Sequence, residues 1–169
     1  MRRILIAFLI MTPCLFAYGD RKNCKEVSGG VVTNFQTESG TVKFGDGNGQ
    51  SFLFTTLGTA TGDLAGGIGV YIFSFTPGNP AVANVHYHWV TNPGDTINLA
   101  DATAYAYPVG THAGIYATGG GSYTATITGG TGRFAHATGQ LSFSGVLDQN
   151  QGTVVLRYQG TICFAEPQH

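Results

Sequence analysis

Turn-forming segments rich in glycine, asparagine and proline divide residues 24 to 164 into short extended runs, and this spacing constrains the fold more than any other feature. Clear examples are "GDGNG" at 45–49, "TPGNP" at 76–80, "TNPGD" at 91–95 and "LDQNQG" at 147–152. Between such turns, apolar and polar residues often alternate with the period of two that is typical of half-buried strands. No run has the long helical pattern that a parallel crossover needs, so we expect antiparallel strands joined by hairpins.

The composition supports an all-β fold in one domain. Of 169 residues, 10% are charged and 26 are glycine, while the residues that usually fill exposed helix faces are scarce. Closure into a barrel removes the exposed edges that an open sheet would leave. We therefore predict a single closed antiparallel β-barrel of about eight strands over residues 20–169, with a two-sheet β-sandwich as the alternative.

Residues 1–19 have the layout of a secretory signal peptide. Two arginines precede an apolar run from Ile4 to Phe16, and small residues follow at Ala17 and Gly19. The apolar run is too short to span a bilayer comfortably. We expect cleavage after residue 17 or 19, which gives a secreted or periplasmic protein without a stable membrane anchor.

Removal of this segment changes both the cysteine content and the charge of the chain. Two cysteines remain, Cys24 and Cys163, one near each end of the mature chain. In an oxidising compartment they are candidates for one disulfide, with two free buried thiols as the alternative.

Six basic residues remain against nine acidic ones, so the mature chain is mildly acidic. Without a basic stripe, we expect no binding to nucleic acid.

A glycine-rich stretch, "ITGGTGRFAHATGQLSFSG" at 127–145, invites comparison with phosphate-binding loops. Such a loop needs a Lys-Ser/Thr pair and a following helix, and this stretch has neither. We interpret it as a corner that closes one end of a barrel, where Gly129 and Gly130 permit positive φ and Phe134 plugs the mouth. Arg133 would then bind strand-end carbonyls or a carboxylate; binding of an anion or a catalytic role is the weaker alternative.

Part of this corner also resembles a known family. The run "YTATITGGTGRFAHATGQLSF" at 123–143 resembles the signature of the allene oxide cyclase and dirigent proteins, in which a hydrophobic strand, a Gly-Gly-Ser/Thr-Gly turn and a second strand follow one another. The resemblance implies an eight-stranded antiparallel barrel, often dimeric or trimeric. It also implies an apolar cavity that holds a reactive lipid epoxide or a phenolic radical in one conformation and guides its cyclisation or coupling. The acidic cavity residues of that family have no counterpart that can be placed in this chain.

The segment "VHYHW" contains the strongest candidate for a metal site. His86 and His88 are two residues apart, so on a strand both side chains project from one face. The other face of this run, which includes Tyr87 and Trp89, is apolar and is expected to face the core. His86 and His88 would then point outward or toward a subunit contact, and metal binding is the weaker hypothesis. We expect no metal and no organic cofactor.

Asp101 lies within "INLADATAYAY", in line with Ile97, Leu99, Tyr105 and Tyr107. A buried acid on such a face would have a raised pKa and would suit general acid catalysis, with Tyr105 beside it. The alternative, that Asp101 marks a bend or the end of a strand, is favoured. Asp101, Tyr105 and Arg133 are therefore weak catalytic candidates, and no hydrolytic triad can be assembled.

Two classes of function remain after these steps. One is a secreted barrel that binds a hydrophobic small molecule and guides its cyclisation or coupling; the other is a non-catalytic barrel for structural or protein contacts. The run Ile68–Phe75, "IGVYIFSF", is apolar on both faces and is the predicted surface for homo-oligomer formation. A cavity lined by tyrosine, tryptophan, an acid and a histidine would favour guided cyclisation or coupling, and a barrel filled solid by phenylalanine and leucine would favour the non-catalytic role.

Overall fold

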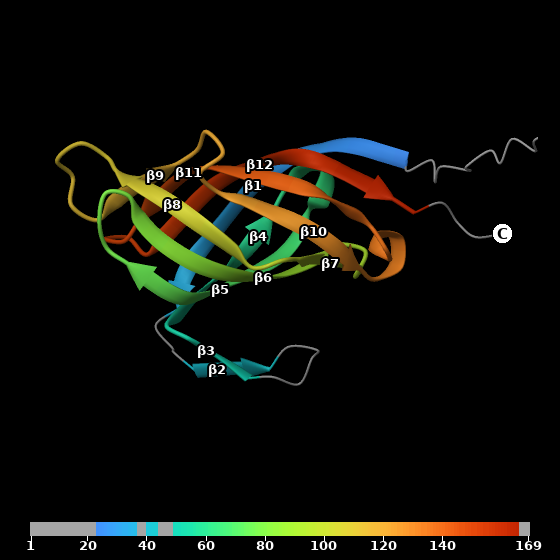
Figure 1. The fold of residues 1–169 in the computed structure, drawn as a ribbon, viewed down its shortest axis with the longest axis horizontal. Coiled ribbons are helices and arrows are strands. Elements are labelled where there is room, and N and C mark those ends of the chain that lie inside the picture. The colour runs from blue at the N-terminus through green and yellow to red at the C-terminus, as the bar shows by residue number, and fades with distance from the viewer. Residues whose placement is uncertain (1–22, 37–39, 44–48, 166–169) are drawn as a thin grey trace, which may run out of the picture.

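The computed structural model describes residues 23–36, 40–43 and 49–165. The predicted signal peptide, residues 1–19, lies outside the described residues. Figure 1 shows strands wrapped into a barrel with little other secondary structure. The elements are, in chain order, β1 (Asn23–Gln36), β2 (Gly40–Lys43), β3 (Gly49–Phe52), β4 (Phe54–Ala60), η1 (Gly62–Leu64), β5 (Gly66–Thr76), β6 (Ala81–Thr91), β7 (Thr96–Leu99), β8 (Ala102–Pro108), β9 (Ile115–Thr118), β10 (Thr124–Gly130), η2 (Gly132–Phe134), β11 (Thr138–Asp148) and β12 (Thr153–Phe164), where η denotes a 3₁₀ turn.

Ten of these strands form one sheet that closes on itself. Strands β6, β5, β4, β1, β12 and β11 follow one another, each paired antiparallel with the next. β7 and β8 share the position beside β6, while β10 and β9 share the position beside β11. β7 pairs with β10, and β8 pairs with β9. The barrel therefore has eight strand positions, which confirms the predicted closed antiparallel barrel and rules out the sandwich.

A break at residues 100–101 separates β7 from β8 and changes which side chains face inward. Ile97 and Leu99 of β7 are buried in the core. In β8, however, Tyr105 is 42% exposed, and the inward positions belong to small residues. The prediction that residues 101 to 107 continue the face of Ile97 and Leu99 is therefore wrong, because the two residues outside the strands shift the alternation by one. The inward positions of β8 are occupied by Ala102, Ala104 and Ala106.

One end of the barrel is filled with large side chains, and we call it the plugged end. Here β4, β6 and β10 end and β12 reaches its last residues. Both 3₁₀ turns also lie at this end, and each buries one side chain, Leu64 or Phe134. The hydroxyl of Tyr158 accepts a hydrogen bond from Leu64 N–H and donates one to Thr61 C=O, both at 2.8 Å. Trp89 Nε1 donates to Leu64 C=O at 2.9 Å. The largest fully buried side chains at this end are Leu64, Trp89, Ile97, Ile127, Phe134, Leu141, Tyr158 and Ile162.

The two turns at the plugged end share a sequence pattern. "TGDLA" at 61–65 and "TGRFA" at 131–135 each place a threonine before the turn, a glycine at positive φ, and a buried apolar residue at the third position of the turn. In each, the last alanine N–H donates to the carbonyl of the glycine, at 3.2 Å and 3.1 Å. The second turn is the corner predicted from the glycine stretch, with Phe134 fully buried. The first turn is its structural counterpart between β4 and β5.

The short hairpin β2–β3 connects β1 to β4 and pairs only with itself in the described residues. In Figure 1 it lies outside the wall of the barrel. Among the described residues, no helix is long and apolar enough to span a membrane.

Candidate functional site: a cavity in the hollow end

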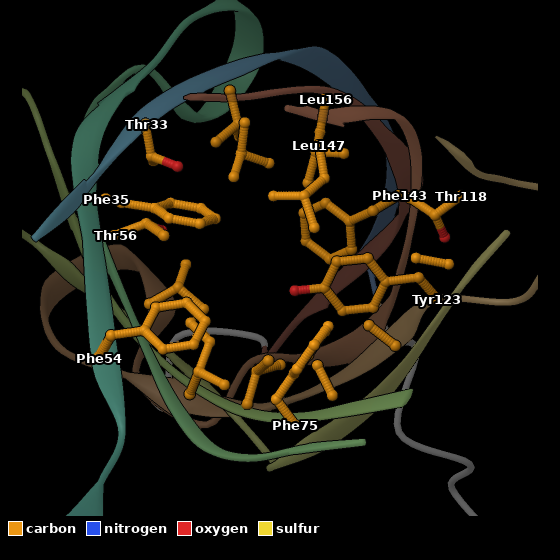
Figure 2. A pocket seen from close by; sticks show the side chains of 18 of the residues that line it. Thr33, Phe35, Phe54, Thr56, Phe75, Thr118, Tyr123, Phe143, Leu147 and Leu156 are labelled. Atoms are coloured by element: carbon orange, nitrogen blue, oxygen red, sulfur yellow. The ribbon is translucent and has the colours of Figure 1, made fainter. Parts of the chain in front are cut away.

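The end of the barrel opposite the plug contains a cavity of about 100 Å³, and we call this end the hollow end. One water needs roughly 10 to 15 Å³ of such space, so the cavity has room for a small organic molecule. In Figure 2, Phe35 and Phe54 lie on one side of the space, and Phe143 and Tyr123 lie on the other. Phe35, Phe54 and Phe75 are each partly exposed, which places the mouth of the cavity at this end.

The cavity exists because small side chains face inward on neighbouring strands. Ala83 of β6 is paired with Ala104 of β8, and both line the space. Ala81 and Ala106 form the next inward pair of the same two strands. At the plugged end, the inward-facing residue of β6 is the large, fully buried Trp89, whose side chain fills the interior. Because the alternation changes at residues 100–101, the alanines of β8 face the interior and its tyrosines face outward.

The wall of the cavity is almost entirely apolar. Among the described lining residues there is no Asp, Glu, His, Lys or Arg. Polar groups come from hydroxyls and one side-chain amide, and the residues that supply them are Thr33, Thr56, Thr118, Gln149, Tyr87 and Tyr123. General acid–base chemistry inside the cavity would therefore depend on phenol hydroxyls.

Tyr87 and Tyr123 are the two phenols of this wall. Their rings stack with centroids 6.3 Å apart and an interplanar angle of 21°, and both pack against Phe143, at 5.9 Å and 4.8 Å. Figure 2 shows the Tyr123 hydroxyl directed into the open space. Burial raises the pKa of both hydroxyls, and for Tyr87 the neighbouring Tyr123 raises it further. Both groups are therefore neutral hydrogen-bond donors at physiological pH.

The Tyr87 hydroxyl differs from every other buried polar side-chain atom in the described part of the chain, because it has no hydrogen-bond partner. Tyr87 is only 3% exposed. Buried hydroxyls normally have a partner, and an orphan of this kind calls for an explanation. The hydroxyl belongs to a residue of the cavity wall.

The predicted site residues lie outside the cavity. Asp101 stands at the break between β7 and β8, on the outer surface, where it contacts His86 with 2.5 Å between His86 Nδ1 and Asp101 Oδ1. The His86 ring also packs near Tyr71 and Phe73 of β5, at centroid distances of 6.5 Å and 6.2 Å. The structure thus brings together, in one contact on the outer surface, two residues that were considered separately from the sequence.

Three further candidates also lie on the outside of the barrel. His88 is exposed on the outer face of β6, and Tyr105 is exposed on β8. Arg133 sits in the second corner, with its guanidinium carbon 4.6 Å from the Phe134 ring centroid and its Nε 4.0 Å from Asp95 Oδ2. Within the described residues, no three His, Cys, Asp or Glu side chains come together as a potential metal site.

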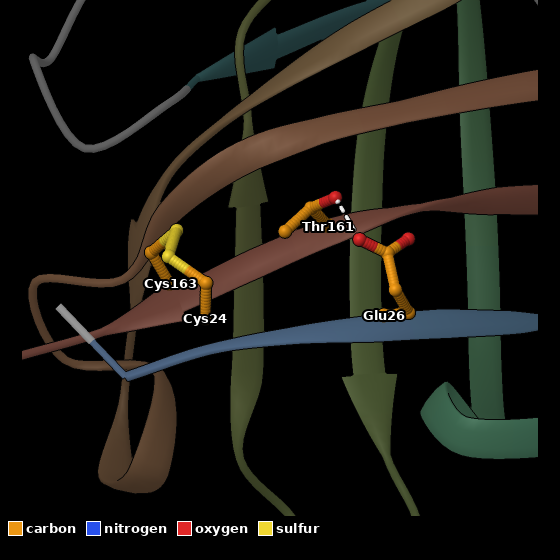
Figure 3. Close-up of a disulfide and its surroundings, with 4 residues drawn as sticks. All are labelled: Cys24, Glu26, Thr161 and Cys163. Atoms are coloured by element: carbon orange, nitrogen blue, oxygen red, sulfur yellow. Dashed lines mark hydrogen bonds between the residues drawn. A yellow bond between two sulfur atoms is a disulfide. The ribbon is translucent and has the colours of Figure 1, made fainter.

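The predicted disulfide is confirmed. Cys24 of β1 and Cys163 of β12 are paired across the two strands and joined through their sulfurs, as Figure 3 shows. Two residues further along, Thr161 Oγ1 donates to Glu26 Oε1 at 2.7 Å and links the same two strands again. The disulfide links β1, the first described strand, to β12, the last, at the plugged end.

Sequence reasoning placed Tyr87 on the inner face of its strand but gave it no role. Its alternation with His86 and His88 contained that information, because residues of opposite parity on one strand face opposite sides. Tyr123 begins the run "YTATIT" at 123–128, in which it shares the apolar parity of Ala125 and Ile127, so the same signal was present there. The pairing of these two tyrosines depends on contacts between strands, which the sequence alone does not give.

Comparison with known proteins gives little further information. No protein-family model matches the chain, and no match was found among curated proteins. Among solved structures, the pterocarpan synthase dirigent protein aligns with 94% of this chain and 100% of its own, at 13% identity and a TM-score of 0.44. A likeness at this level carries no conclusion about the role of the chain.

Proposed function

We propose that this protein binds an apolar small molecule in the cavity of its hollow end. The observation that carries the proposal is the apolar cavity beside a buried phenol hydroxyl that has no partner. Ligand sites in proteins combine mostly apolar walls with a few placed polar groups, and this cavity has the same composition. The partly exposed ring of Phe35, Phe54 and Phe75 gives a ligand access from solvent.

The proposal includes a finer part, in which the barrel guides the cyclisation or coupling of the bound molecule. The resemblance of residues 123–143 to allene oxide cyclases and dirigent proteins motivates it. The cavity has no carboxylate or imidazole in its described wall, so its contribution would be confinement of a reactive molecule in one conformation. Secretion after loss of residues 1–19 belongs to the same proposal, and the Cys24–Cys163 disulfide is compatible with an oxidising compartment.

An NMR titration of the mature protein with naphthalene tests the binding function. We expect saturable, one-to-one shifts of amide signals from β6 and β8, which flank the cavity. Ala83→Leu adds bulk inside the cavity and should weaken binding at least 10-fold. Ala117→Leu is the matched control, because Ala117 precedes the lining residue Thr118 on β9 and therefore faces away from the cavity. Non-saturable shifts in the wild type, or equal binding by Ala83→Leu, would refute the proposal.

A second candidate function, a barrel for protein contacts, has one observation in its favour. Val32, Val155 and Val146 lie next to one another across β1, β12 and β11, and their exposed fractions are 47%, 50% and 42%. Self-association through Ile68–Phe75 is a related proposal, although the outward Tyr71 and Phe73 are partly covered by His86. Native mass spectrometry of the wild type, Val155→Lys and Tyr71→Lys distinguishes these surfaces. A monomeric wild type would contradict self-association through either.

A further inference from the structure

We propose that the cavity is built for a neutral ligand with a hydrogen-bond acceptor oxygen, such as a ketone or ester on an apolar skeleton, and that the hydroxyls of Tyr87 and Tyr123 bind this oxygen. The inference rests on the proposed binding function, because it names the class of ligand for the same cavity. It adds a chemical requirement that an apolar cavity alone does not impose.

The first argument is the unsatisfied hydroxyl of Tyr87. Its oxygen is buried and makes no hydrogen bond of acceptable geometry among the described residues. The neighbouring hydroxyl of Tyr123 is close enough to raise the pKa of Tyr87, but it does not complete that hydrogen bond. At the plugged end, the comparable buried hydroxyl of Tyr158 has two partners, Leu64 N–H and Thr61 C=O. The buried tyrosine hydroxyl in the solid part of the core therefore has hydrogen-bond partners, and the one beside the cavity has none. A ligand acceptor would supply the missing partner.

The second argument is the position of Tyr123 beside Tyr87. The two rings are stacked and belong to neighbouring strand positions, since Tyr123 forms a bridge with Ala104 of β8, and β8 is paired with β6. Tyr123 is close enough to influence the pKa of Tyr87, and its own hydroxyl points into the cavity in Figure 2. One acceptor oxygen placed between the two hydroxyls can accept a hydrogen bond from each, because such an oxygen has two lone pairs.

The third argument concerns charge. The described wall contains no basic residue that could neutralise an anion and no acidic residue that could neutralise a cation. Burial also keeps both phenols protonated, so they donate but do not carry charge. An ionised ligand would lose its hydration without gaining a charged partner, which is strongly unfavourable. The cavity thus selects against carboxylates and amines of the same shape.

Three probes of nearly equal size separate these requirements: ethylbenzene, acetophenone and benzoate. Binding to the mature protein is measured by calorimetry at pH 7.4. We expect acetophenone to bind about 5- to 10-fold tighter than ethylbenzene, because a neutral hydrogen bond changes affinity by roughly this factor. Benzoate should show no saturable binding. In isotope-edited infrared spectra, the carbonyl stretch of bound acetophenone should move to lower wavenumber than in hexane.

Variants assign the effect to the two hydroxyls. Tyr87→Phe with Tyr123→Phe should bring the affinities for acetophenone and ethylbenzene within twofold of each other, while ethylbenzene binding persists. Tyr105→Phe is the matched control, because Tyr105 lies on the outer surface and should leave the preference unchanged. Should the double variant not fold, the infrared shift in the wild type still tests the hydrogen bond.

The outcomes separate this inference from the binding function. Equal affinities of the wild type for acetophenone and ethylbenzene would mean that the hydroxyls serve a bound water, and would overturn the inference while the binding function stands. Persistence of the ketone preference in the double variant, or an unshifted carbonyl stretch, would overturn it as well. Benzoate binding comparable to that of acetophenone would overturn the requirement for neutrality. Binding of none of the three would overturn the proposed function together with the inference.

Discussion

The two ends of this barrel are built from similar residues but treat their buried polar groups differently. At the plugged end, Tyr158 and Trp89 direct their polar atoms to the backbone of the first 3₁₀ turn and find partners there. At the hollow end, Tyr87 is equally buried, but its hydroxyl finds none. Aromatic content alone therefore does not distinguish a core from a site.

The difference predicts which substitutions change stability and which change the proposed binding. A fully packed region with satisfied polar groups contributes to the free energy of unfolding, whereas a void loses contacts that a core would make. Inward alanines on β6 and β8 create that void at the hollow end only. We expect substitutions at the plugged end to change stability, and substitutions at the hollow end to change ligand binding.

The largest effect is expected from Phe134→Ala. Phe134 is fully buried in the second corner and packs 5.9 Å from Phe164, so its truncation should lower the free energy of unfolding by about 3 to 5 kcal/mol. Phe75→Ala is the matched change at the hollow end, where the ring is already partly exposed, and should lower it by about 1 kcal/mol. Urea denaturation measures both, and equal losses would contradict the division between the two ends.

The disulfide at the plugged end is the next largest contribution. Replacement of both Cys24 and Cys163 by serine should lower the free energy of unfolding by about 2 to 5 kcal/mol, because the bond closes a loop between residues 139 positions apart. Ligand affinity at the hollow end should change less than twofold. Denaturant unfolding and a naphthalene titration of the same sample check the two statements. A large loss of affinity in the folded variant would show that the ends are coupled.

Gly130→Val tests the corner at the end of β10. A Cβ atom at Gly130 would lie 2.0 Å from Thr96 C=O and 2.9 Å from Phe134 Cβ, so the backbone has to move. We expect a loss of about 1 to 3 kcal/mol. Gly67→Val is the control at the same end, because a Cβ there meets no atom within 4 Å, and valine suits a strand. Similar melting temperatures for the two variants would argue against the close approach at Gly130.

The corner and the barrel show what a sequence pattern can predict. In β12 the even positions from Val154 to Tyr158 face inward, as their alternation indicated, and the glycine stretch forms the expected corner around Phe134. These features are local, because strand period and turn chemistry depend on neighbouring residues. The matching turn at 61–65 carries the same threonine–glycine pattern and was missed, since no glycine pair precedes it as Gly129 and Gly130 precede the second corner.

The site was less predictable, because it depends on which strands meet. The alternation through Asp101 gave the wrong face for Tyr105, as two residues without strand pairing reverse the phase and no local signal marks them. The cavity is formed where inward alanines of the paired strands β6 and β8 meet. The contact between Tyr87 and Tyr123 likewise depends on how β6, β8 and the start of β10 lie beside one another. The register between strands depends on the whole closed sheet and cannot be predicted from the sequence of a single strand.

Tyr158→Phe removes the hydroxyl that holds the first 3₁₀ turn. The change leaves the buried Leu64 N–H without its acceptor and the Thr61 C=O, whose hydrogen bond is partly buried, without its donor. We expect a loss of about 1 to 3 kcal/mol, and faster hydrogen exchange at Leu64. Tyr116→Phe, on the partly buried strand β9, is a control for removal of a phenol hydroxyl. Unchanged exchange at Leu64 would contradict the role assigned to Tyr158.

The smallest effect at neutral pH is expected from Tyr87→Phe in the ligand-free protein. The hydroxyl that it removes has no partner, so the free energy of unfolding at pH 7 should change by less than about 0.5 kcal/mol, or rise. The sign becomes clear at high pH. Burial, and secondarily Tyr123, raise the pKa of Tyr87 in the folded protein above its ordinary value of 10.0, so above pH 10 the unfolded chain loses a proton that the folded protein keeps.

That proton loss favours unfolding, and the stability associated with Tyr87 therefore falls as pH rises from 10 toward the raised pKa, by up to about 1.4 kcal/mol per pH unit. Tyr87→Phe has no titratable hydroxyl at this position, so it should become more stable than the wild type by about 1 kcal/mol near pH 11. Urea unfolding at pH 7 and at pH 11, with Tyr105→Phe as the exposed control, measures the difference. A loss of stability in Tyr87→Phe at pH 7 comparable to that of Tyr158→Phe would show that the Tyr87 hydroxyl has a structural partner, and the contrast between the two ends would not hold.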